Sequence, residues 1–169
     1  IKAVLRVYSF KLYEVFNLYV LIKALEELGA DIEIEHRIVR AQWGEKNIEI
    51  LVNQSIEDIA LQGIRPIPDI TLRNTERIVL ETKFSFSSSY LSQAVFKVIS
   101  YMVICKAKVG ILTFPRMPDI SNLLDEEERR MCEWMKKYGA NGKTLKIANE
   151  EYKLYTIELE PVKKREYFN

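Results

Sequence analysis

Histidine and cysteine are scarce in this chain, which has 169 residues with one histidine and two cysteines. The histidine, His36, lies in a stretch that alternates like a β-strand, so we expect a surface residue rather than a ligand or a base. One histidine also argues against zinc sites and other histidine-bound metals. Cys105 and Cys132 are far apart and each follows an apolar residue, which predicts reduced, buried thiols and a cytoplasmic location.

Long apolar runs, repeats and an excess of charge are also missing. No apolar run approaches the length of a membrane span, and we expect no signal peptide. The net charge is +1, so any positive surface that attracts nucleic acid must be local. The length and the 48% hydrophobic content predict a single domain over residues 1–169. Because the first residue is not methionine, we expect a module of a larger protein.

The most informative feature is Pro68-Asp69, followed by Glu81-Thr82-Lys83. Residues 67–73 and 77–84 are rich in β-branched side chains and predict two strands. If residues 74–76 form a three-residue turn, antiparallel partners have numbers that sum to 150. Asp69 would then lie directly opposite Glu81, on the face from which Lys83 also projects.

Two opposed carboxylates repel each other unless a cation lies between them. Oxygen ligands from Asp69, Glu81 and the carbonyl of Thr82 suit a divalent cation of the magnesium type. Such a cation lowers the pKa of a bound water, and Lys83 would stabilise the charge that develops on a phosphate. The pattern therefore predicts hydrolysis of phosphodiester bonds. Without the metal, replacing either acid should leave folding intact or improve it.

These residues resemble the motif of the PD-(D/E)xK nuclease superfamily, which includes restriction enzymes, Holliday junction resolvases and RecB-type nuclease domains. The resemblance implies an α/β fold with a restriction-endonuclease-like α-β-β-β-α-β core, in which helices flank a mixed sheet. It covers most of residues 11–115 and implies DNA as the partner and Mg²⁺ or Mn²⁺ as the cofactor.

Hydrophobic periodicity around the motif is compatible with that core. We expect helices over residues 12–28 and 90–106, the first ending at Gly29 and the second capped by Ser88 or Ser89. We expect further strands over residues 32–39, 47–52 and 109–114. A C-terminal extension, residues 116–169, should contain a helix from Asp125 to Tyr138 and a closing hairpin over residues 144–148 and 152–159.

The resemblance also suggests further site residues. RecB-like and McrC-like members carry a glutamine at the place of Gln93, which makes Gln93 a catalytic candidate. Lys97 and Tyr101 follow at helical spacing on the same face, and with Ser87 and Ser88 at the helix start they are candidates for binding nucleic acid. The first helix looks like that of McrC-like domains, so Glu14 is a candidate metal ligand.

Each candidate has a structural alternative. Asp69 and Glu81 could form a plain salt bridge with Lys83, while Glu14 and Gln93 could be exposed helix positions. For the whole chain we expect a divalent-metal-dependent deoxyribonuclease. The alternatives are a dimeric, structure-selective resolvase and a catalytically degenerate module for DNA binding or assembly.

Overall fold

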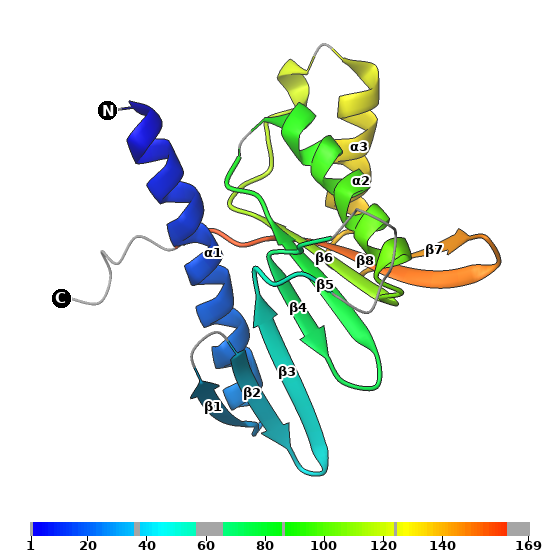
Figure 1. The fold of residues 1–169 in the computed structure, drawn as a ribbon. Helices are drawn as coiled ribbons and strands as arrows, with labels where there is room; N and C mark the ends of the chain where they lie inside the picture. Colours follow the sequence, from blue (N-terminus) through cyan, green and yellow to red (C-terminus); the bar gives the residue numbers. More distant parts are fainter. Residues whose placement is uncertain (1, 36–37, 57–65, 86, 124, 162–169) are drawn as a thin grey trace.

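The computed structural model describes residues 2–35, 38–56, 66–85, 87–123 and 125–161, without the side chains of residues 2–8 and 122. These residues form an α/β fold with one mixed sheet of eight strands in the order β1-β2-β3-β4-β5-β6-β8-β7 (Figure 1). The elements are α1 (Lys2–Glu27), β1 (Asp31–Glu35), β2 (Ile38–Trp43), β3 (Lys46–Val52), β4 (Ile70–Arg73), β5 (Arg77–Thr82), α2 (Ser88–Ile104), β6 (Val109–Phe114), the 3₁₀ turn η1 (Ile120–Asn122), α3 (Glu126–Tyr138), β7 (Lys143–Ile147) and β8 (Glu150–Glu158).

The first five strands form an antiparallel meander, and its β4–β5 hairpin has the predicted register. Ile70 pairs with Leu80 and Thr71 pairs with Val79, across a loop of residues 74–76. Partner numbers sum to 150, as expected. The strand β4 begins only at Ile70, however, so Asp69 lies in a bend just before the ladder.

The sheet changes direction after β5. The helix α2 connects β5 to β6, which pair in parallel, and β6 also pairs in parallel with β8. The carboxyl ends of β5, β6 and β8 therefore lie at the same edge of the sheet. We refer to this edge as the carboxyl edge. Ligands of open α/β sheets bind outside the carboxyl ends of parallel strands, so this edge is the natural place to look for a site.

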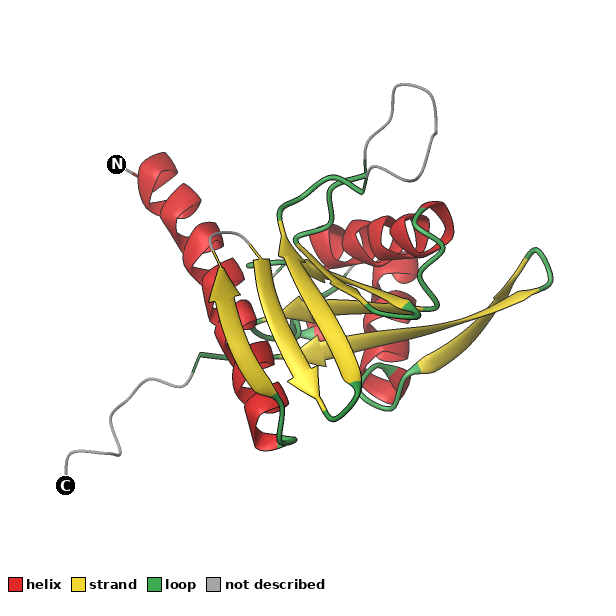
Figure 2. Ribbon diagram, turned by 60° about the horizontal axis from the view of Figure 1, so that its bottom comes forward, coloured by secondary structure: helices red, strands yellow, loops and turns green. Residues whose placement is uncertain are grey.

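Alternation along β5 divides the apolar interior into two clusters, one on each sheet face. Val79 belongs to a cluster with Val98 and Met102 of α2, while Leu80 belongs to a cluster with Leu25 of α1. Glu81 has the parity of Val79 and so faces α2. Figures 1 and 2 show α1 beside the β1–β3 half of the sheet and α2 with α3 beside the β6–β8 half.

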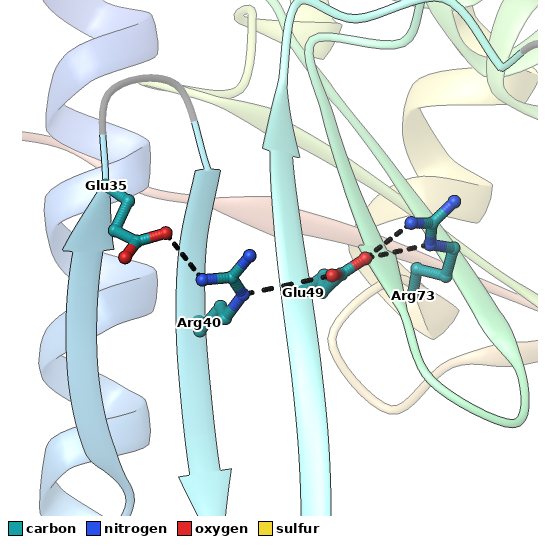
Figure 3. Close-up of polar contacts among 4 residues, drawn as sticks. All are labelled: Glu35, Arg40, Glu49 and Arg73. Atoms are coloured by element: carbon teal, nitrogen blue, oxygen red, sulfur yellow. Dashed lines mark hydrogen bonds and ion pairs between the residues drawn. The ribbon is translucent and has the colours of Figure 1, made fainter.

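A ladder of ion pairs crosses the exposed face of the meander (Figure 3). Nη1 of Arg40 lies 2.6 Å from Oε2 of Glu35, and Nε of Arg40 lies 4.0 Å from Oε1 of Glu49. Oε2 of Glu49 lies 2.5 Å from Nη2 of Arg73. Four charges of alternating sign thus join β1, β2, β3 and β4 on the face opposite the one that packs on α1.

Several predicted elements are confirmed. The strand over residues 109–114 has the predicted bounds, and α3 begins after Asp125, whose side chain accepts a hydrogen bond from the amide of Glu128 at 2.8 Å. The first helix ends before Gly29, which has φ +87 and donates its amide to the carbonyl of Glu26. The closing hairpin is β7 and β8.

Other predictions were wrong in detail. The single strand expected over residues 32–39 is two antiparallel strands, in which Glu35 pairs with Ile38. An alternating pattern has the same period in both arms of a hairpin, so it does not reveal the reversal. The α/β class and the mixed sheet are as expected, but five strands, rather than three, separate α1 from α2, so the predicted α-β-β-β-α-β order is not confirmed. The N-cap of α2 is Ser87, which makes no side-chain cap bond, rather than Ser88 or Ser89. His36 lies outside the described residues.

Candidate functional site

The motif residues meet at the carboxyl edge. Lys83 follows directly after β5, and its amide donates to the carbonyl of Thr113 in β6 at 2.8 Å. This bond continues the parallel ladder beyond Thr82 and fixes the direction in which the chain leaves the sheet. Asp69 approaches the same place from the start of β4.

Asp69 is bound to the backbone of the opposite strand. Its Oδ2 accepts hydrogen bonds from the amide of Thr82 at 2.7 Å and from the hydroxyl of Thr82 at 2.8 Å. Its own carbonyl accepts from the amide of Asn53 at 2.9 Å. The amide of Thr82 therefore bonds with the side chain of Asp69 instead of a backbone carbonyl of the β4–β5 ladder. The predicted arrangement, with Asp69 in the strand directly opposite Glu81, is therefore corrected.

Glu81 is the most buried charged group of the site, with 1% of the residue exposed. Its Oε1 lies 2.5 Å from Nζ of Lys97 and 2.8 Å from Nζ of Lys83. Its Oε2 is buried and finds no hydrogen-bond partner within the described residues. Two ammonium groups therefore neutralise one oxygen, and the other oxygen keeps its capacity to accept.

The charge of Glu81 acts on the carboxyl of Asp69. Burial, the charge of Glu81 and the charge of Glu14 raise the pKa of Asp69, although the bonds from Thr82 oppose the shift. Burial alone would lower the pKa of Lys97, but the hydrogen bond and charge of Glu81 outweigh it and raise the pKa. Lys97 is therefore firmly charged, and the site holds carboxylates in a partly desolvated place, as metal and catalytic sites do.

Glu14 reaches the border of the site from α1. Its Oε2 lies 2.8 Å from Nζ of Lys11 and 3.2 Å from Nδ2 of Asn53, and 18% of its side chain is exposed. Its charge also contributes to the raised pKa of Asp69, and Asn53 links the two acids through its side chain and its amide. The structure thus brings Glu14 near the site, while its described contacts are with Lys11 and Asn53.

The three residues of the polar face of α2 have different surroundings. Lys97 contacts Glu81, and its Nζ lies 5.3 Å from the ring centroid of Tyr101. The hydroxyl of Tyr101 donates to the carbonyl of Ile67 at 3.1 Å. Gln93, one turn before Lys97, is exposed. Lys97, which we expected to bind phosphate, is the helix residue that touches the motif, and Gln93 is not among the described contacts of Glu81.

The serines at the start of α2 also differ. Ser87 is exposed, and its amide donates to Oγ of Ser85 at 3.1 Å. Ser88 is buried, and its hydroxyl donates to Oε2 of Glu128 in α3 at 2.5 Å. Ser88 thus joins two helices, and its hydroxyl is already engaged.

The carboxylates of Asp69 and Glu81 are the oxygen donors that the site offers to the expected divalent cation. Within the described ranges, no three histidine, cysteine or acidic side chains lie close enough to share a metal ion. Magnesium, however, is commonly held by one or two carboxylates and keeps several waters. The free Oε2 of Glu81 and the neighbouring carboxylate of Asp69 fit that pattern. Thr82 contributes its amide and hydroxyl to Asp69, and its role as a carbonyl ligand stays a prediction.

Asn53 is a site residue that the sequence did not indicate. It follows β3 directly, has φ +49, and connects Asp69 through its amide to Glu14 through its side chain. Asparagine tolerates the left-handed conformation better than most residues. An asparagine just after an apolar strand is the one signal that could have pointed to it.

Comparison with known proteins gives no relative. No protein-family model matches the chain, no curated protein matches it, and no solved structure matches it. None of the helices in the described residues is long and apolar enough to cross a membrane.

Proposed function

We propose that this chain is a divalent-metal-dependent nuclease domain that hydrolyses DNA phosphodiester bonds. The observation that carries the proposal is the carboxylate of Glu81, which is 1% exposed and has an oxygen without a partner in the described part of the chain. It lies beside Lys83, and its charge acts on Asp69. These are the three residues whose spacing resembles the PD-(D/E)xK motif.

A purely structural role explains this arrangement poorly. Burying a carboxylate with its cations is often no more stabilising than burying apolar side chains of similar volume. A leucine at position 81 would extend the cluster that already contains Val79 and Leu112. The fold could therefore accept an apolar side chain at position 81. Because Glu81 lies at the edge where parallel strands end, its charge favours a chemical role.

The residues have separate roles in the proposed reaction. Asp69 and Glu81 would hold Mg²⁺ or Mn²⁺, which when bound supplies a water of lowered pKa and polarises the phosphate. Lys83 places an ammonium group beside Glu81 and would stabilise the negative charge that develops on the phosphate in the transition state. Thr82 keeps Asp69 in position through two hydrogen bonds.

One observation favours a second candidate, a catalytically degenerate module that binds DNA. Lys97 and Lys83 both form ion pairs with Oε1 of Glu81 and so can neutralise this carboxylate by themselves. In that case the site residues would stabilise the fold, and only cations at the surface would contact the nucleic acid.

Cleavage of labelled single-stranded, duplex and branched DNA in Mg²⁺, Mn²⁺ or EDTA separates the two candidates. A nuclease should cut only with metal, and Asp69→Ala and Glu81→Ala should abolish the reaction. Glu76→Ala, which removes an exposed acid of the same hairpin, is the matched control. Cleavage at the wild-type rate by both site variants would show that the site is misplaced. DNA binding without cleavage under every condition would support the degenerate module.

A further inference from the structure

A cavity of about 910 Å³ lies at the carboxyl ends of β6 and β8, and the proposed reaction does not use it. Its lining includes Phe114 at the end of β6, Arg116 and Met117 from the loop that follows, and Met135 and Lys136 from the last turns of α3. The volume lies within the range of small-molecule sites, roughly 300–1,000 Å³. We call it the carboxyl-edge cavity.

The cavity is next to the candidate site. Glu81 pairs with Leu112 in the parallel ladder, and Phe114 lies two residues further along β6 with the same parity. Strands are spaced by about 4.8 Å and rise about 3.3 Å per residue, so the Cα atoms of Glu81 and Phe114 lie roughly 8 Å apart. Both side chains point to the sheet face that α2 and α3 cover.

The walls of the cavity are held in place by specific contacts. A Cβ at Gly139 would lie 1.8 Å from Oγ1 of Thr156, so a glycine is required where α3 meets β8. The amide of Thr156 donates to the carbonyl of Gly139 at 3.1 Å. On the other side, Oδ1 of Asp119 accepts from the amide of Ser121 at 3.1 Å and from its hydroxyl at 2.7 Å. The cavity is therefore formed before any ligand arrives.

The lining suits a ligand that carries both a flat apolar group and a phosphate. Met117, Pro118 and Ile120 are partly exposed and supply apolar surface above the buried Phe114 and Met135, and methionine adapts to the faces of aromatic rings. Arg116 and Lys136 are exposed, and neither forms an ion pair with any residue in the described segments. Two acids, Asp119 and Glu158, line the same cavity, and Oδ1 of Asp119 is engaged by Ser121. A free phosphate would leave the apolar surface unused, whereas a nucleotide would use both parts.

We propose that the carboxyl-edge cavity takes an unpaired nucleotide of the strand that is cut. The inference rests on the proposed nuclease function and specifies its substrate as single-stranded DNA, or duplex DNA with an unpaired nucleotide beside the scissile phosphate. The estimated 8 Å between the two Cα atoms is short enough for one strand to reach both places, since even a stacked strand rises about 3.4 Å per nucleotide. A paired base is held in its stack and can enter such a cavity only after it is extruded.

Binding in EDTA tests the proposal without cleavage. The probes are a fluorescent single-stranded oligonucleotide, a blunt duplex of the same sequence, and the duplex with one unpaired nucleotide. Ala140→Trp fills the cavity from an exposed position of its rim, and Lys136→Ala removes one of its cations. Lys137→Ala, the next residue of α3, is the matched control because Lys137 interacts with Tyr138 instead.

We expect Ala140→Trp and Lys136→Ala to weaken binding of the probes with unpaired nucleotides by at least about fivefold, the lower end of the contribution of one stacked base. Binding of the blunt duplex and all binding by Lys137→Ala should stay unchanged. Equal weakening for all probes would mean that the cavity residues contact the DNA backbone without selecting unpaired nucleotides, and would overturn the proposal. The absence of any weakening would also overturn it. Thermal unfolding of each variant confirms that the fold is intact.

The same variants separate this inference from the proposed function. If no metal supports cleavage but the cavity variants still lose selective binding, the nuclease proposal fails and the cavity assignment holds. If metal-dependent cleavage is present and the cavity variants keep the wild-type preference among the three probes, the cavity assignment alone fails.

Discussion

Nζ of Lys97 lies 2.5 Å from Oε1 of Glu81, and this contact joins the middle of α2 to the end of β5. The lysine side chain is 41% exposed, whereas Glu81 is 1% exposed. The ammonium group therefore covers the buried carboxylate on its solvent side. Any cation that binds Glu81 must use the other oxygen or compete with this ammonium group.

Lys97→Met should strengthen the binding of Mn²⁺. The substitution removes a positive charge that competes for Glu81, and a partly exposed ion pair contributes up to about 1 kcal/mol, so we expect the dissociation constant to fall by about fivefold. Isothermal titration calorimetry measures the change. Gln93→Ala, an exposed position one turn away, should leave the affinity unchanged. Equal affinities for Lys97→Met and the wild type would contradict the competition.

The same geometry changes the expected order of effects on α2. The sequence makes Gln93 a catalytic candidate and Lys97 only a candidate for binding nucleic acid, and on that basis alone Gln93→Ala is expected to reduce activity more than Lys97→Ala. Because Lys97 contacts Glu81 and Gln93 is exposed, we now expect Lys97→Ala to change the single-turnover rate more than Gln93→Ala does. Single-turnover rates of the two variants on the same oligonucleotide decide the order.

Lys83→Met should reduce the single-turnover rate by at least about a hundredfold, the size of effect seen when one electrostatic stabiliser is removed. Metal binding should persist, because Asp69 and Glu81 remain. Lys146→Met is a suitable control, since the side chain of Lys146 is 79% exposed. Loss of DNA binding with an unchanged chemical step would assign Lys83 to substrate binding instead.

Glu81→Gln should destabilise the protein. The sequence led us to expect that removal of an acid would relieve repulsion, but Glu81 bonds with two lysines. Removing one partner of a buried ion pair costs about 3–5 kcal/mol, and partial exposure of the lysines reduces this to about 1–2 kcal/mol here. Urea denaturation gives the free energy of unfolding, and an increase in stability would show that the ion pairs contribute nothing.

Asp69→Asn should have the opposite effect, and the effect should depend on pH. The pKa of Asp69 is raised above its ordinary 3.8 in the folded protein, chiefly by burial. The folded state therefore binds the proton more tightly than the unfolded chain, and stability is lost as the pH rises through the raised pKa. We expect the asparagine variant to gain stability at about pH 7 and to lose that gain toward about pH 4. Urea denaturation at both pH values tests this, and a gain that does not change with pH would rule out the ionisation of Asp69 as its cause.

Gly110→Ala should destabilise the contact between α2 and β6. A Cβ at this position would lie 2.3 Å from Sδ of Met102 and 2.6 Å from Cγ1 of Val98, both in the interior. Overpacking of this kind costs about 1–3 kcal/mol. The change in the midpoint of urea denaturation measures it, and a shift equivalent to less than about 0.5 kcal/mol would mean that Met102 moves aside freely.

Local signals predicted much of the fold. The register of the β4–β5 hairpin followed from the loop of residues 74–76, and the start of α3 followed from Asp125. The contact of Lys97 with Glu81 did not follow, because it depends on how α2 is rotated on the sheet. Burial of Val98 and Met102 against Val79 sets that rotation, and these contacts join separate elements. The carboxyl-edge cavity was missed for the same reason, since its lining comes from β6, a loop, α3 and β8.

The ladder from Glu35 through Arg40 and Glu49 to Arg73 has a consequence for long-range attraction. Charges of alternating sign at such short distances cancel, so their combined field decays within a few ångströms of the surface and is screened further by salt. A polyanion that diffuses toward the meander therefore meets an almost neutral surface. Arg116 and Lys136 form no ion pair in the described segments, but Asp119 and Glu158 line the same cavity, so an anion is attracted there only at short range.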